Sequence, residues 1–159
     1  MSARLALAAL TASTLIVACG GSEPAAEAAA PRSAQPATPA AAPLTEVELE
    51  QGIGPIRDLQ LGPIDAELAS AGEQAFTLKC SACHKIEERY VAPPLGEVLS
   101  HRRPEFVMNM ILNATEMVQR HPEVQKLLAE YCTPMTVQVT KESEARAILE
   151  YLRSVQIPP

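Results

Sequence analysis

Five consecutive residues, Cys80-Ser81-Ala82-Cys83-His84, place two thiols and an imidazole next to one another in the chain. Thiols and imidazoles bind transition metals, and thiols also form disulfides and act as nucleophiles. This segment is therefore the strongest candidate for chemistry in the sequence. Four interpretations compete: a redox-active disulfide, a structural disulfide, half of a zinc site, and covalent attachment of a haem through both thiols.

The rest of the sequence separates these interpretations. A redox-active C-x-x-C requires a strand–helix–strand context, and the sequence carries almost no strand signals. A zinc site needs a second pair of ligands, and Cys132 is the one cysteine left after the N-terminal segment. A disulfide between Cys80 and Cys83 leaves His84 unexplained. Attachment of haem c explains all three residues, because each thiol adds to one vinyl group and His84 then lies under the iron as its proximal ligand.

A helix positions this motif. Asp65 can cap a helix over residues 66–80 that ends at the first thiol. One stripe of this helix carries residues spaced four apart, which are Leu68, Gly72 and Phe76. Upstream, the Gly-Pro pairs at 54–55 and 62–63 indicate an extended segment that wraps the domain.

Four more helices are predicted, and each has a cap or an N-terminal proline. One is short, is capped by Thr45 and stops at Gly52; the others begin at Pro104, at Pro122 and after Thr140. Cys132 is expected to be a small buried residue near the end of the Pro122 helix. The sequence therefore predicts an all-α fold.

The N-terminus looks like an export signal. Arg4 precedes an apolar stretch that is 14 residues long, and Ile16-Val17-Ala18-Cys19 resembles the lipobox of bacterial lipoproteins. This predicts a signal peptide over 1–18, a lipidated Cys19, a disordered Ala/Pro-rich tether over 19–43 and a folded domain over 44–159. The protein would sit on the periplasmic side of a bacterial membrane.

Composition excludes several function classes. The net charge is −6 and no basic cluster is longer than Arg102-Arg103, which argues against nucleic-acid binding. No apolar run approaches the roughly 20 residues that a membrane-spanning helix needs. The chain has no Trp, two Phe and three Tyr, and a buried porphyrin would replace the missing large side chains.

The chain resembles the class I mono-haem cytochrome c family over most of residues 65–155. The resemblance rests on Gly72-x-x-x-Phe76 ahead of the C-x-x-C-H motif, on Ile148-x-x-Tyr151-Leu152, and on Val91-Ala92-Pro93-Pro94-Leu95. It implies that the first and last helices cross at the glycine. It also implies that the Pro93 carbonyl accepts a hydrogen bond from His84, and that Leu95 packs on the porphyrin.

The sixth iron ligand is chosen from a short set of side chains. Met135 lies in a loop just before the last helix, where the family carries its distal methionine, and the resemblance therefore implies Met135. The alternatives are an open site, His101, His121, Met108, Met110 and Met117. Both histidines are expected to be exposed, and methionines on a helix stripe more often fill a core.

A haem held by an imidazole and a thioether has no free position for a substrate. This predicts a one-electron carrier and not an enzyme. The run from Gly54-Pro55-Ile56 through the last helix also resembles small cytochromes that accompany bacterial respiratory reductases. That resemblance implies that the protein shuttles electrons between respiratory partners, for which nitrous oxide reductase is one candidate. A basic rim of Lys79, Lys85, Arg89, Arg102 and Arg103 would guide docking. Two alternatives stay open: a haem sensor or enzyme with an open distal site, and a fixed cytochrome subunit of a larger oxidoreductase complex.

Overall fold

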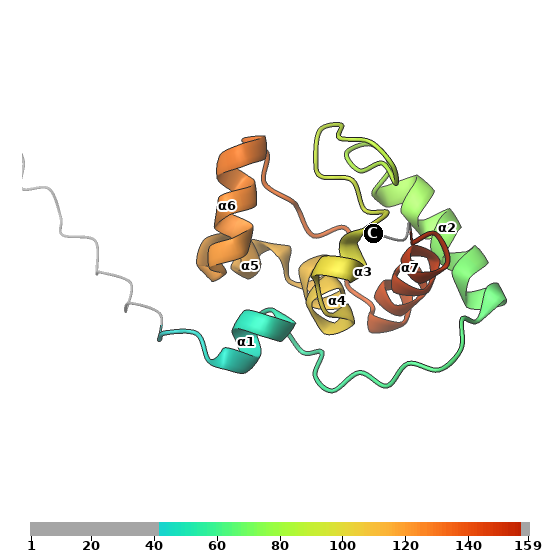
Figure 1. Cartoon of the computed structure of the whole chain (residues 1–159), viewed down its shortest axis with the longest axis horizontal. Coiled ribbons are helices and arrows are strands. Elements are labelled where there is room, and N and C mark those ends of the chain that lie inside the picture. Colours follow the sequence, from blue (N-terminus) through green and yellow to red (C-terminus); the bar gives the residue numbers. More distant parts are fainter. Residues whose placement is uncertain (1–41, 157–159) are drawn as a thin grey trace, which may run out of the picture. The chain divides into compact units, whose positions relative to one another are not determined.

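Seven helices and no strand are found in residues 42–156, the part of the chain that this computed structural model describes (Figure 1). In order they are α1 (Glu46–Gln51), α2 (Ala66–Lys79), α3 (Val98–His101), α4 (Pro104–Leu112), α5 (Ala114–Arg120), α6 (Pro122–Tyr131) and α7 (Glu142–Ser154). This confirms the all-α fold class. None of these helices is long and apolar enough to cross a membrane. The predicted signal peptide, Cys19 and nearly all of the tether lie outside the described residues.

Helices α2 and α7 pack closely against each other (Figure 1), and they cross at Gly72. A Cβ atom on Gly72 would lie 1.9 Å from the carbonyl oxygen of Ala147, so a side chain there would collide with the α7 backbone. Next to the crossing, the rings of Phe76 and Tyr151 pack with their centroids 5.3 Å apart. Lys79 at the end of α2 pairs with Glu144 of α7 at 2.6 Å. The crossing that the resemblance implied is therefore present.

Residues 52–65, which we call the strap, connect α1 to α2 and run along α4. The buried side chain of Asn109 holds the strap: its Nδ2 donates to the carbonyls of Gln51 and Ile56 at 2.8 and 3.0 Å, and its Oδ1 accepts from the Ile56 N–H at 2.9 Å. Gly54 lies so close that a Cβ there would be 2.3 Å from Oδ1 of Asn109. The predicted extended segment is therefore fixed by a polar side chain in the core.

The downstream end of the strap is fixed on α7 by the buried carboxylate of Glu150. This carboxylate accepts the Asp65 N–H at 2.8 Å and forms ion pairs with Arg146 and Arg153. Burial by itself would raise the pKa of Glu150, but the hydrogen bonds from Arg146, Asp65 and Arg153 outweigh it and hold the pKa below its ordinary value of 4.5. The carboxylate therefore stays ionised in the folded protein at neutral pH.

Several local predictions need correction. The predicted helix from Pro104 ends at Leu112, and a separate helix, α5, follows after Asn113. The short helix α3 was not predicted. Thr140 is not the cap of the last helix, which begins after Lys141 without a side-chain cap. The other starts, at Asp65, Pro104 and Pro122, are as predicted, because each depends on residues within one turn of the helix.

Two clusters of buried side chains make up the core. The first lies between α2, α4 and α7, and it consists of Ile56, Phe76, Val107, Met108, Ile111, Val139, Ala145, Ile148, Leu149 and Leu152. The second lies under α1, between α4, α5 and α6, and contains Ile53, Phe106, Met117 and Val124. The candidate methionine ligands differ in the cluster that they contact: Met108 and Met135 belong to or pack on the first, and Met110 and Met117 to the second.

Candidate functional site

The C-x-x-C-H motif forms a tight turn directly after α2. The backbone N–H groups of Cys83 and His84 both donate to the carbonyl of Cys80, at 3.0 and 2.9 Å. Both thiols are free; Cys83 is exposed and Cys80 is partly buried. Burial raises the pKa of Cys80 to about 11. This shift is opposite in direction to the lowered pKa of reactive cysteines.

The zinc interpretation also loses support. Within residues 42–156, no group of three or more His, Cys, Asp or Glu side chains is arranged to hold a metal ion. Cys132, the third cysteine in this region, is exposed at the end of α6 in the left-handed conformation, with φ of 52°. The prediction that Cys132 is buried was wrong, because the residue caps the helix and does not lie on its apolar stripe.

The ring of His84 is oriented by one hydrogen bond. Its Nδ1–H donates to the carbonyl oxygen of Pro93 at 2.9 Å, which is the bond that the resemblance implied. In the described part of the chain this is the ring's one hydrogen bond, so Nε2 keeps its lone pair for a ligand. Burial lowers the pKa of His84, and the bond to Pro93 only partly opposes this shift. His84 is therefore a neutral imidazole at neutral pH, which is the form that binds a metal.

Residues 85–96, which we call the proximal loop, hold Pro93 in place. One backbone hydrogen bond ties this loop to the motif, from the Ala92 N–H to the carbonyl of Cys83 at 3.0 Å. Two more join the end of the loop to its beginning, Leu95 to Lys85 at 2.9 Å and Gly96 to Ile86 at 2.8 Å. The family pattern has glycine where this chain has Ala92. Among the described non-glycine residues only Asp58 and Cys132 have a positive φ, so Ala92 adopts its conformation without strain.

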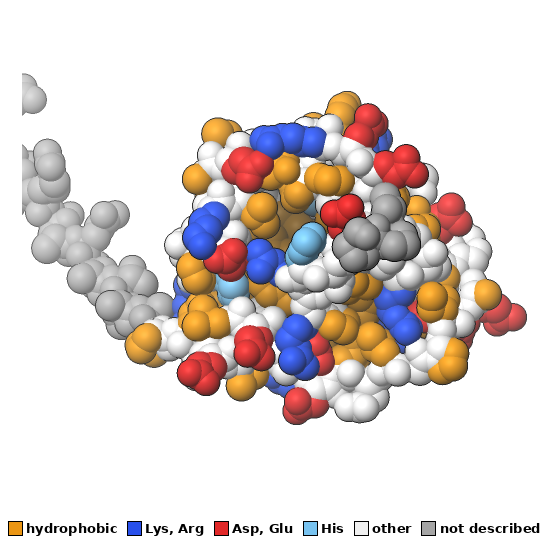
Figure 2. Space-filling model, in the orientation of Figure 1, with side chains coloured by type: hydrophobic (Ala, Val, Ile, Leu, Met, Phe, Trp, Pro, Cys, Tyr) orange, Lys and Arg blue, Asp and Glu red, His pale blue; other side chains and the backbone are white. Residues whose placement is uncertain are grey.

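Met135 lies in the segment between α6 and α7, residues 132–140, which we call the distal loop. Its side chain is half-buried and packs against the first core cluster, as do Cys80 and Leu95. Figure 2 shows a hollow with a hydrophobic floor between α6, α3 and the proximal loop. These side chains leave apolar surface exposed around one cluster, and a flat apolar group such as a haem would cover that surface.

The other methionines in the described part of the chain fill the core or pack on the second cluster. Met108 and Met117 have no exposed surface, whereas a side chain lining the hollow would retain some. The sulfur of Met117 accepts the Ile53 N–H at 3.0 Å. Met110 packs against the second cluster. Among the methionines of residues 42–156, Met135 therefore combines partial exposure with contact to the cluster that Cys80 touches.

The two alternative histidines differ from each other. His101 is exposed, as predicted. His121 was predicted to be exposed and is 1% exposed, because α1 covers it and its ring packs edge-on against Phe106. Its Nε2–H donates to the carbonyl of Leu49 at 3.1 Å. Bis-histidine ligation by His121 would require this buried contact with α1 to break.

The predicted basic rim is largely neutralised by carboxylates. Four of its five cations form ion pairs: Lys79 with Glu144, Arg89 with Glu130, Arg102 with Glu123, and Arg103 with both Glu50 and Glu105. Lys85 donates to the carbonyl of Ser81 instead. Charge in this region is therefore mixed, and strong electrostatic steering by a basic rim is not supported.

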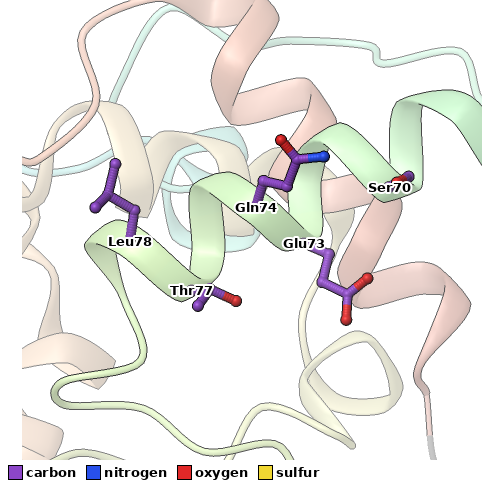
Figure 3. A pocket seen from close by; sticks show the side chains of 5 residues that line it. All are labelled: Ser70, Glu73, Gln74, Thr77 and Leu78. Carbon is purple, nitrogen blue, oxygen red and sulfur yellow. The ribbon is translucent and has the colours of Figure 1, made fainter.

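A depression elsewhere on the surface carries no comparable chemistry. It lies along the outer side of α2 and is lined by Ser70, Glu73, Gln74, Thr77 and Leu78 (Figure 3). All five side chains come from one helix, and none belongs to the motif, the proximal loop or the distal loop.

Comparison with known proteins agrees with this geometry. The family model for cytochrome c matches residues 69–156. A solved cytochrome c from Rhodothermus marinus is 48% identical with a TM-score of 0.65, and the match covers 68% of this chain and 94% of that one. An engineered form of that cytochrome, Rma TDE, is 47% identical with a TM-score of 0.64, covering 68% and 95%.

The same engineered protein bound to a carbene intermediate is 46% identical with a TM-score of 0.62, covering 68% of this chain and 95% of that chain. None of the curated proteins compared with the chain matches it. With a family match over more than half of its length and 48% identity to nearly all of a solved cytochrome, the chain belongs to the cytochrome c family and carries that family's covalently bound haem c.

Proposed function

We propose that this cytochrome is a one-electron carrier with a single haem c, attached at Cys80 and Cys83 and ligated by His84 and Met135. Haem-based electron transfer is the function of the family. The observation that carries the assignment of His84 is its 2.9 Å hydrogen bond from Nδ1–H to Pro93, which leaves Nε2 as the ligating atom. The assignment of Met135 is supported by its partial exposure and its packing on the cluster that Cys80 also contacts. When bound, haem c supplies an iron that gains and loses one electron.

The protein's own residues favour a carrier over a catalyst. His84 and Met135 would both hold the haem iron, and this would leave no coordination position open to a substrate. The soft sulfur favours the reduced state and thereby raises the reduction potential. The apolar side chains that pack on the first core cluster, including Leu95, would keep water away from the haem.

We further propose that the carrier is held at the periplasmic side of a bacterial membrane by lipid on Cys19. Two or more acyl chains anchor a protein stably, and the Ala/Pro-rich tether over 19–43 would let the folded domain move between partners. Its partners would be respiratory redox proteins, and nitrous oxide reductase is the one we would examine first. The paired cations around the motif lead us to expect that docking depends weakly on salt.

Absorption spectra of the full-length protein test the carrier proposal. A carrier with thioether ligation should show the near-infrared sulfur-to-iron charge-transfer band when oxidised, and it should bind carbon monoxide slowly or weakly when reduced. Wild-type protein that lacks the band and binds carbon monoxide at once would replace the carrier with a sensor or an enzyme. Purification in mild detergent as a fixed complex with an oxidoreductase would replace the shuttle with a subunit.

A further inference from the structure

The proximal loop is joined to the end of α6 by one arginine. Arg89, at the tip of the loop, donates through NH1 to Oε1 of Glu130 at 2.5 Å and through NH2 to the Glu130 carbonyl at 3.4 Å. Its guanidinium carbon also lies 4.1 Å from the ring centroid of Tyr131. We call these three contacts the clasp. They connect Arg89 to two residues that lie 41 and 42 positions further along the chain.

Each side of the clasp leads to a candidate iron ligand. On one side, the proximal loop is tied to the motif by the backbone hydrogen bond from Ala92 to Cys83 and by the bond between His84 and Pro93. Two further backbone hydrogen bonds close the loop on itself, so Arg89 projects from a fixed base. On the other side, Tyr131 is the last residue of α6 and Met135 follows four positions later. Figure 1 shows the proximal loop and the end of α6 on the same side of the molecule.

The chain between Tyr131 and Met135 has little freedom. Cys132 is held in the left-handed conformation with its N–H bonded to the Leu128 carbonyl, and Pro134 has a fixed φ. The far end of the distal loop is anchored by Val139, which is 1% exposed in the first core cluster. The position of the end of α6 therefore sets where Met135 can reach.

We propose that the clasp is the latch of the distal side: Arg89 holds the end of α6 against the proximal loop and thereby keeps Met135 on the iron. Arg89 is a positioning residue in this scheme, since it acts through Glu130 and Tyr131 and does not touch the iron. When the clasp opens, the start of the distal loop moves, Met135 withdraws, and an external ligand enters. This inference rests on the proposed role of Met135.

The test uses imidazole as a probe of the oxidised, full-length protein. Imidazole competes with Met135, so its apparent affinity reports the fraction of molecules in which the distal loop is open. An exposed ion pair and an exposed cation–π contact together correspond to about a 3- to 30-fold change in an equilibrium. We therefore expect Arg89→Ala to bind imidazole about 3- to 30-fold more tightly than wild type.

Matched variants separate a latch from general surface packing. Tyr131→Leu and Glu130→Gln should each tighten imidazole binding by part of that amount, and Arg89→Lys should restore part of the wild-type affinity. Lys126→Ala is the control, because Lys126 also lies on α6 and forms an exposed ion pair, but its partner Glu123 is on the same helix. It should leave imidazole binding within about twofold of wild type, since such a pair contributes little.

The outcomes divide cleanly. If Met135→Ala loses the near-infrared band while Arg89→Ala and Tyr131→Leu bind imidazole as wild type does, the clasp proposal is overturned and the ligand assignment stands. If Met135→Ala keeps the band, both proposals fail. If Arg89→Ala binds imidazole more tightly and Lys126→Ala does not, the latch is supported. A contact with a merely structural role would lower the free energy of unfolding in Arg89→Ala and leave imidazole binding unchanged.

Discussion

The assignment of Met135 as an iron ligand can be tested by comparing Met135→Ala with Met110→Ala, because the two changes should remove a similar amount of packing. The two side chains are chemically identical, and both are half-buried. They pack against different clusters, Met135 against the cluster that Cys80 also contacts and Met110 against the one under α1. A difference between the two variants therefore reports on the environment of the sulfur and not on the loss of a methionine as such.

The magnitudes follow from burial. A fully buried methionine changed to alanine costs about 2–5 kcal/mol, so a half-buried one should cost about 1–3 kcal/mol. Loss of packing alone should therefore cost both variants a similar free energy of unfolding. In guanidinium unfolding Met135→Ala should be the less stable of the two, because it also loses the proposed iron–sulfur bond. Met117→Ala should lose more packing free energy, because that side chain has no exposed surface and its sulfur accepts the Ile53 N–H.

The spectra should then differ completely. Haem should remain covalently attached in both variants, as a haem-stained denaturing gel would show, because Cys80 and Cys83 are unchanged. Met135→Ala should lose the near-infrared band, bind carbon monoxide readily when reduced and have a lower reduction potential, whereas Met110→Ala should keep the band and the potential. Loss of the band in Met110→Ala with its retention in Met135→Ala would refute the assignment and leave the cytochrome intact.

Three shorter predictions follow. Cys19→Ser should move the protein from the membrane to the soluble fraction without changing its spectrum, and mature wild-type protein found free of membranes would contradict lipidation. Gly72→Ala should lower the free energy of unfolding by at least about 1–3 kcal/mol, because the added Cβ would collide with the Ala147 carbonyl; this outweighs the better helix propensity of alanine. Gly62→Ala is the control: a Cβ there would have no atom within 4 Å, so the free energy of unfolding should change little. The pKa of Glu150 is lowered in the folded state, so the carboxylate stabilises the fold above pH 4.5, its ordinary pKa, and this stabilisation is lost as the pH falls below that value. Between about pH 6 and 3, the free energy of unfolding should therefore fall less steeply in Glu150→Gln than in wild type.

Features fixed by neighbours in the sequence could be predicted. The attachment motif, the caps at Asp65 and Thr45 and the proline starts of α4 and α6 each depend on a few consecutive residues. Asn113 separates α4 from α5 without a proline or glycine to mark the break, so that boundary could not be predicted. Thr140 was predicted as the N-cap because threonine is favoured at that position, but the N-cap of α7 is the next residue, Lys141.

Features fixed by distant contacts could not be predicted. His121 is 72 positions from the carbonyl that its ring binds, and nothing near it in the sequence indicates that α1 will cover it. Asn109 lies on an apolar helix, where an amide suggests an exposed position, yet it is 0% exposed and satisfies the backbone of the strap. A buried polar side chain of this kind requires a partner, and the sequence does not say which segment supplies it.

The two faces of the haem differ in this same respect. The proximal ligand is fixed by a hydrogen bond between residues nine positions apart, within a loop that closes on its own motif. Met135, the proposed distal ligand, lies on a loop that begins just after Glu130, whose contact with Arg89 is exposed and spans 41 positions. Exposed contacts are weaker and easier to alter than the partly buried hydrogen bond of His84, so substitutions that tune this cytochrome should act first on the distal side. The proximal imidazole should then keep its orientation while the strength of the Met135 bond varies.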